Sequence, residues 1–142
     1  MKSAHILLVE DNEGDILLTK EAFEDRKLIN KLSVVKDGKE ALDFVFKEGK
    51  YTDAETPDLI LLDINLPKKN GIEVLKALKE NQKTKVIPVI MLTTSSTEKD
   101  ILLSYQNYAN SYITKPVEMK SFMDAVYAIE DFWFQLVSLP KS

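Results

Sequence analysis

Acidic side chains, a hydroxyl and a lysine follow four short apolar segments, each of strand length. Glu10 and Asp11 come after the first such segment along the chain, Asp63 after the third, Thr93 after the fourth and Lys115 after the fifth. The carboxyl ends of parallel strands meet at one edge of a sheet, where ligands of open α/β sheets bind. We therefore expect three carboxylates, a hydroxyl and an ammonium group to converge at that edge.

Three crowded carboxylates repel one another, by roughly 4 kcal/mol per pair at ~4 Å and an effective dielectric near 20. A hard divalent cation removes this repulsion, and Mg²⁺ prefers a few carboxylates completed by waters and phosphate oxygens. A carboxylate can also be a phosphoryl nucleophile. Because phosphoryl transfer needs mainly positioning and charge neutralisation, this set of residues is typical of Mg²⁺-dependent transfer to an aspartate.

The elements that must position these residues alternate along the chain. Apolar, β-branched segments predict strands over Ile6–Val9, Leu32–Val35, Leu59–Leu62, Val86–Leu92 and Tyr112–Thr114. Amphipathic segments lie between them, and repeated β–α units require a parallel sheet with right-handed crossovers and helices on both faces. No linker-like segment divides the chain, so we expect one α/β domain over residues 1–142.

The helices are predicted over residues 12–26 and Gly38–Lys47, and from Asn70, Ser95 and Met119 onward. Asp37 is a favourable N-cap for the second helix, and Gly49 favours its end. The third helix has an apolar stripe at Ile72, Leu75 and Leu78. Each crossover is therefore a helix with one face suited to pack on the sheet.

Charge and residue types exclude several classes of function. The formal net charge is -4, so we expect no binding to nucleic acid, which needs a basic surface. Cysteine is absent, which excludes disulfide, thiol and zinc–thiolate chemistry. The apolar segments are too short to span a membrane and the N-terminus does not resemble a signal peptide, so we expect a cytoplasmic protein.

Four segments, in order, resemble the receiver domain of bacterial two-component response regulators, of which the CheY-like proteins are the minimal form. They are ILLVEDN (6–12), LILLDINLPKKNG (59–71), VIMLTTS (89–95) and SYITKP (111–116). The resemblance implies a flavodoxin-like, doubly wound sheet of five parallel strands in the order 2-1-3-4-5. The receiver pattern accounts for nearly the whole chain, which favours a single-domain regulator and not an enzyme.

The resemblance also implies metal ligands and residues that tune the lifetime of the phosphorylated state. Asp11 and Asp63 would bind Mg²⁺ directly, Glu10 would act beside them, often through water, and the backbone carbonyl of Asn65 would complete the set. Asn65 and Ser95 would flank the path of the hydrolytic water. Both are polar and modest in size, so neither is expected to block that path.

The phosphoryl group is assigned by the same resemblance. Asp63 would be the phosphoacceptor, Thr93 would hydrogen-bond a phosphoryl oxygen, and Lys115 would pair with the group. Tyr112 would be the aromatic switch whose ring turns inward when Thr93 moves to the phosphate. A cis peptide bond would join Lys115 to Pro116.

The predicted last helix, about residues 119–138, has more apolar surface than one buried stripe needs. The excess residues are Phe132, Trp133, Phe134, Leu136 and Val137. Such patches usually mark an interface, so we expect a homodimer through this helix, with a fold-back inside the monomer as the alternative. The tail resembles that of small regulators that partner phytochrome-type kinases.

The phosphoryl donor is expected to be another protein. His5 is the only histidine and begins the first strand, far from the strand ends, so we expect a structural or exposed role for it. A sensor histidine kinase or a phosphotransfer protein would therefore supply the group.

Two other functions fit the same fold class or residue types. An FMN-binding flavodoxin needs a phosphate-binding loop after the first strand, but residues 10–13 there are Glu-Asp-Asn-Glu, which repel phosphate. A haloacid-dehalogenase-like phosphatase needs two aspartates as nucleophile and acid in a D-x-D motif. The residue two after Asp63 is Asn65, which cannot act as an acid.

Overall fold

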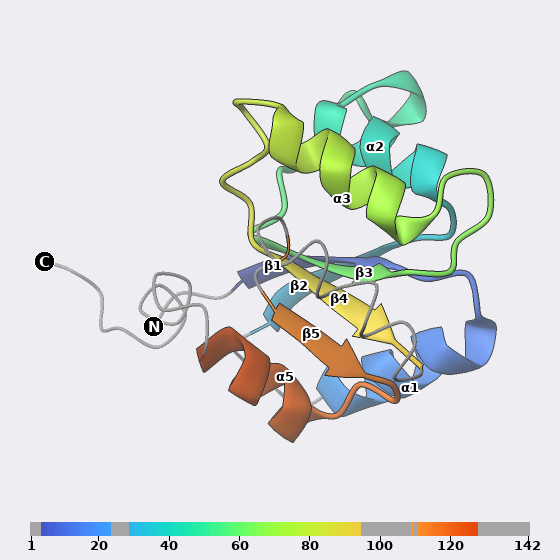
Figure 1. Cartoon of the computed structure of the whole chain (residues 1–142), viewed down its shortest axis with the longest axis vertical. Coiled ribbons are helices and arrows are strands. Elements are labelled where there is room, and N and C mark those ends of the chain that lie inside the picture. The colour runs from blue at the N-terminus through green and yellow to red at the C-terminus, as the bar shows by residue number, and fades with distance from the viewer. Residues whose placement is uncertain (1–3, 24–28, 95–108, 110, 128–142) are drawn as a thin grey trace, which may run out of the picture.

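A five-stranded parallel sheet forms the centre of the computed structural model, which describes residues 4–23, 29–94, 109 and 111–127 (Figure 1). The strands are β1 (Ala4–Val9), β2 (Ile29–Val35), β3 (Leu59–Asp63), β4 (Val89–Thr93) and β5 (Ser111–Thr114). Their order across the sheet is β2-β1-β3-β4-β5, and every neighbouring pair is parallel. The predicted doubly wound arrangement is confirmed.

Helices cover both faces of the sheet. The helices α1 (Glu13–Phe23) and α5 (Met119–Tyr127) pack on one face, and α2 (Gly38–Phe46) and α3 (Gly71–Glu80) on the other (Figure 1). Residues of β1 and β3 alternate between the two resulting cores, and both strands are buried along their whole length. A strand covered on both faces needs such a continuous apolar run.

Two of the predicted helix starts depend on local capping. The Asp37 carboxylate accepts a hydrogen bond from the Glu40 N–H at 2.7 Å and starts α2. Asn70 and Glu73 form a capping box at the start of α3. These side-chain bonds satisfy N–H groups that a helix cannot pair internally, so both start positions are confirmed.

The apolar stripe of α3 differs by one residue from the prediction. Its buried positions are Gly71, Val74, Leu75 and Leu78, which follow the i, i+3, i+4, i+7 spacing of one helix face. Ile72 is partly buried and packs against the same core, while Val74, which the prediction did not include, is fully buried. The predicted stripe is therefore confirmed, with Val74 as an additional buried member.

The predicted start of the fourth strand at Val86 is wrong. The Val86 side chain is 74% exposed, and β4 begins only at Val89. The Lys79 ammonium, at the end of α3, donates to the carbonyls of the residues on either side of Val86, at 3.0 and 2.7 Å. These bonds hold the segment in a turn against α3, and Pro88 has no N–H to donate to a ladder.

The second helix ends at Phe46, one residue before the predicted end at Lys47. Lys47, at φ 59°, takes the left-handed conformation that ends α2. The Glu48 N–H then bonds the Asp43 carbonyl at 2.8 Å and closes the last turn. Gly49 instead begins a short 3₁₀ helix, η1 (Gly49–Tyr51), with its own φ of 59°.

The chain from Met119 onward agrees with the prediction as far as the structure describes it. Phe122 on α5 is fully buried in the core against α1, with its ring centroid 4.8 Å from that of Phe23. The predicted helix from Ser95 and the extension to about residue 138 lie outside the described residues. Within the described part of the chain, no helix has the length and apolar character needed to cross a bilayer.

Candidate functional site

The chemically active residues lie where the sheet topology predicts, at the carboxyl ends of the strands. Glu10 directly follows β1, and its N–H bonds the Val35 carbonyl at the end of β2. Asp63 is the last residue of β3 and Thr93 the last of β4. Lys115 follows β5, with its N–H bonded to the Thr93 carbonyl at 2.8 Å. The sheet therefore supplies these side chains from four adjacent strands.

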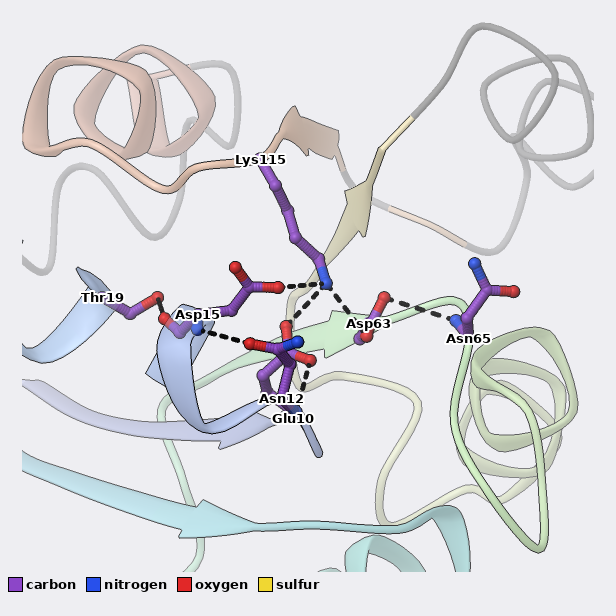
Figure 2. A network of polar contacts seen from close by, with 7 residues as sticks. All are labelled: Glu10, Asn12, Asp15, Thr19, Asp63, Asn65 and Lys115. Atoms are coloured by element: carbon purple, nitrogen blue, oxygen red, sulfur yellow. Dashed lines mark hydrogen bonds and ion pairs between the residues drawn. The ribbon is translucent and has the colours of Figure 1, made fainter. Parts of the chain in front are cut away.

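The Lys115 ammonium lies among three carboxylates (Figure 2). Its Nζ is 2.8 Å from Glu10 Oε1, 3.1 Å from Asp63 Oδ2 and 3.1 Å from Asp15 Oδ2. The Glu10 contact is an ion pair without hydrogen-bond geometry, and the other two contacts are hydrogen bonds. Burial alone would lower the pKa of Lys115, but the carboxylates of Glu10 and Asp63 raise it above its usual value. Lys115 therefore stays charged.

One ammonium does not fully compensate the buried carboxylates. Glu10 and Asp63 are 1% and 2% exposed. Burial and the adjacent Glu10 carboxylate raise the pKa of Asp63 to about 7, although Lys115 acts to lower it. A group of this kind binds a proton or a second cation readily, because either one relieves the repulsion between the two carboxylates.

The acidic residues can hold a divalent cation. Glu10, Asp11 and Asp63 each offer an oxygen, and these atoms lie within 4.8 Å of one another. Glu10 and Asp63 are buried while Asp11 is exposed, so the cluster opens to solvent on the Asp11 side. Oxygen ligands of this number, with room for water, suit Mg²⁺ or Mn²⁺.

Backbone groups fix the two buried carboxylates. The Asn12 N–H donates to Glu10 Oε2 at 3.2 Å, and the Asn65 N–H donates to Asp63 Oδ1 at 3.3 Å (Figure 2). The start of α3 also packs directly on the Asp63 backbone. A Cβ at Gly71 would lie 2.1 Å from the Asp63 carbonyl oxygen, so only glycine fits there. The phosphoacceptor candidate is therefore held at both its side chain and its backbone.

Thr93 contributes a buried hydroxyl. Its side chain is fully buried, and the described residues offer no hydrogen-bond partner for its Oγ1. A buried hydroxyl without a partner is costly, and an arriving ligand oxygen can remove that cost. In β-pairing register, Thr93 follows the partner of Asp63, so this hydroxyl belongs to the same edge.

The remaining residues predicted from the resemblance are placed as follows. The Tyr112 side chain, on β5, is 45% exposed. The Lys115–Pro116 peptide bond is cis. Asn65 is exposed beside Asp63, while Ser95 and the predicted dimer residues 132–137 lie outside the described residues.

Sequence reasoning missed Asp15. This residue is in the first turn of α1, where an acidic side chain is ordinary because it complements the helix dipole. Its spacing of five residues from Glu10 puts it in the first turn of α1, beside the strand ends. That spacing was the available signal, and it pointed to the same edge as the other acids.

A doubly wound sheet with paired acids after β1, an aspartate ending β3 and a lysine after β5 defines a receiver domain. The chain matches the response regulator receiver domain family over residues 6–127, and it belongs to that family. The resemblance inferred from the sequence is confirmed. The match favours neither a flavodoxin nor a haloacid-dehalogenase-like phosphatase.

Individual relatives are similar over almost the whole chain. The response regulator Rcp1 of Synechocystis sp. is 43% identical over 137 residues, covering 96% of this chain and 93% of Rcp1. The phosphorylated cyanobacterial phytochrome response regulator RcpA is 44% identical with a TM-score of 0.77, covering 99% of this chain and all of RcpA. The bacteriophytochrome response regulator RtBRR is 42% identical with a TM-score of 0.85, covering 99% and 84%. A solved structure of Rcp1 is its Mn²⁺-bound form.

Proposed function

We propose that Asp63 accepts a phosphoryl group, with Mg²⁺ present, from a phosphohistidine of a sensor histidine kinase or phosphotransfer protein. The observation that carries the proposal is the buried Asp63 carboxylate held 3.1 Å from Lys115. The buried Thr93 hydroxyl, with no hydrogen-bond partner among the described residues, supports it. A phosphoryl group brings oxygens that an ammonium and a hydroxyl can both bind.

The chemistry requires little of the protein beyond position and charge. A carboxylate oxygen of Asp63 attacks phosphorus, the bond from phosphorus to the donor imidazole nitrogen breaks, and the leaving imidazole takes up a proton. Water later attacks the aspartyl phosphate, which restores the carboxylate and releases inorganic phosphate. Lys115 and Thr93 bind the phosphoryl oxygens, and Mg²⁺ supplies further charge neutralisation.

Glu10, Asp11 and Asp63 are the proposed metal ligands, joined by the backbone carbonyl of Asn65. The cluster of three acidic residues within 4.8 Å supports this set. Asp11→Asn should weaken Mg²⁺ binding sharply, because it removes a direct ligand. Glu10→Gln should weaken it less, because Glu10 acts partly through water. Titration calorimetry of the two variants compares these effects.

Incubation with acetyl phosphate and Mg²⁺ tests the phosphoacceptor. The wild type should gain one phosphoryl group by mass spectrometry, and EDTA should prevent the gain. Asp63→Asn should gain none. Labelling of Asp63→Asn at the wild-type rate would show that another residue is the acceptor.

The proposed donor is a phytochrome-type histidine kinase, because the similar proteins RcpA and RtBRR are phytochrome response regulators. The proposed output is a change in protein binding, with Thr93 and Tyr112 moving together on phosphorylation, or onward phosphotransfer. Transfer from a purified phytochrome-type kinase should be faster than from an unrelated kinase. Equal rates from both kinases would refute the proposed donor without bearing on the proposal that Asp63 is the acceptor.

We also propose a homodimer through the predicted tail helix. The support is the apolar set in residues 132–137, which exceeds the needs of one buried stripe. A two-fold contact would use each aromatic anchor twice.

A further inference from the structure

Asp15 lies against the phosphoacceptor site without belonging to the acidic cluster that can hold a metal. Its Oδ2 is 3.1 Å from Lys115 Nζ (Figure 2). Its side chain is 32% exposed. The cation-holding group consists of Glu10, Asp11 and Asp63. Asp15 is thus a carboxylate whose contact within the site is the lysine.

Asp15 is held in place by its own helix turn. Its N–H donates to Asn12 Oδ1 at 2.9 Å, and its carbonyl accepts a hydrogen bond from the Thr19 hydroxyl, also at 2.9 Å (Figure 2). These contacts fix the backbone, so the carboxylate is presented from a rigid helix start and not from a loop.

Helix-dipole stabilisation alone does not account for this geometry. Glu13, in the same first turn, also complements the dipole, but its carboxylate pairs with the exposed Lys36. The Asp15 carboxylate instead accepts a hydrogen bond from Lys115, which is 100 positions away in sequence and follows β5. Glu13 can therefore serve as the control position for substitutions at Asp15.

Competition for Lys115 follows from the arrangement. The ammonium has three N–H donors, and Glu10, Asp63 and Asp15 surround it. When a metal ion binds the carboxylates of Glu10 and Asp63, Asp15 would remain as the carboxylate that pairs with Lys115. A phosphoryl group on Asp63 must then attract Lys115 against Asp15.

We propose that Asp15 is a positioning residue that holds Lys115 toward α1 and competes with phosphoryl oxygens for it. The proposal rests on the function proposed for Asp63. Under this proposal, Asp15 has two opposite effects on the site. By drawing Lys115 away from Glu10 and Asp63 it favours metal binding, and by retaining Lys115 it weakens the hold on the phosphoryl group.

The test compares Asp15→Asn with Glu13→Gln, which removes the same charge from the same helix turn. At saturating Mg²⁺, Asp15→Asn should bind beryllofluoride, a phosphoryl analogue, about threefold or more tightly than wild type, and its aspartyl phosphate should decay more slowly. Without the analogue, it should bind Mg²⁺ more weakly than wild type. Glu13→Gln should match the wild type in all three measurements, and Asp15→Glu should behave more like the wild type than Asp15→Asn does.

A double-variant cycle separates the ion pair from a general charge effect. In a Lys115→Ala background, Asp15→Asn should leave Mg²⁺ and beryllofluoride affinities unchanged, because the partner of Asp15 is gone. An effect of Asp15→Asn that persists in that background, or that Glu13→Gln reproduces, would overturn the proposal. Unchanged affinities in Asp15→Asn with normal Asp63 phosphorylation would also overturn it. A wild type that is never phosphorylated would instead refute the proposed function.

Discussion

Removing the Asp63 charge should stabilise the metal-free protein at neutral and alkaline pH. The Asp63 carboxyl is 2% exposed and lies beside Glu10, and its pKa rises from 3.8 to about 7. The folded protein therefore holds the Asp63 proton more tightly than the unfolded chain does. Asp63→Asn is uncharged at every pH, and it leaves Lys115 paired with Glu10 and Asp15.

The sign and size of the effect follow from proton linkage. Below pH 3.8 the group is protonated in both states, so the variant and the wild type should have similar stability. Between pH 3.8 and about 7 only the folded state keeps the proton, so the wild type loses on the order of 1.4 kcal/mol for each pH unit of rise. From about pH 5 to about pH 7 the gap should grow by roughly 3 kcal/mol. For a domain of this size that corresponds to roughly 6–12 °C in melting temperature.

Thermal melts of both proteins in EDTA, followed by circular dichroism from about pH 4.5 to pH 8, measure this gap. Titrating groups remote from the site are common to the two proteins, so the difference reports Asp63 together with its coupling to Glu10 and Lys115. Adding Mg²⁺ at the alkaline end should narrow the stability gap, because the ion binds the folded wild type more strongly than the folded Asp63→Asn variant. A gap that stays constant across the pH range, or that favours the wild type, would refute the reasoning.

Three further predictions concern different parts of the chain. Asn65→Arg should change the rate of autodephosphorylation without abolishing phosphorylation, as followed by decay of the labelled protein; an unchanged rate would contradict the lifetime role. Gly71→Ala should cost about 1–3 kcal/mol in urea unfolding, because the added Cβ would lie 2.1 Å from the Asp63 carbonyl oxygen; wild-type stability would contradict the close packing. Sedimentation should show a wild-type dimer that Phe134→Asp with Val137→Asp converts to monomer, and a monomeric wild type at high micromolar concentration would exclude the dimer.

Sequence reasoning succeeded where a signal was local or repeated. Strand order came with the family resemblance, and the caps at Asp37 and Asn70 followed from side chains three residues from their partners. The acids and the lysine could be gathered at one edge because parallel strands all end there. The convergence of Glu10, Asp63 and Lys115 needed only the topology.

The misses have a common physical cause, which is contact between segments that the local pattern does not contain. Val86 has the residue type of a strand, but the Lys79 ammonium holds its neighbours in a turn. Asp15 has an adequate local explanation as a helix-start acid, and only the folded chain reveals its contact with Lys115.

The position of β1 between β2 and β3 has a consequence for the folding of the chain. Residues 4–63 already contain three neighbouring strands and both buried acids of the site, whereas Lys115 lies 52 residues after Asp63. Domains generally fold as units, and contacts that close long loops are slow to form. Pairing of β1 with β3 would bring Glu10 and Asp63 together before the longer loop to Lys115 closes. A divalent cation bound between them would offset their repulsion, so the ion expected to serve phosphorylation would also favour folding.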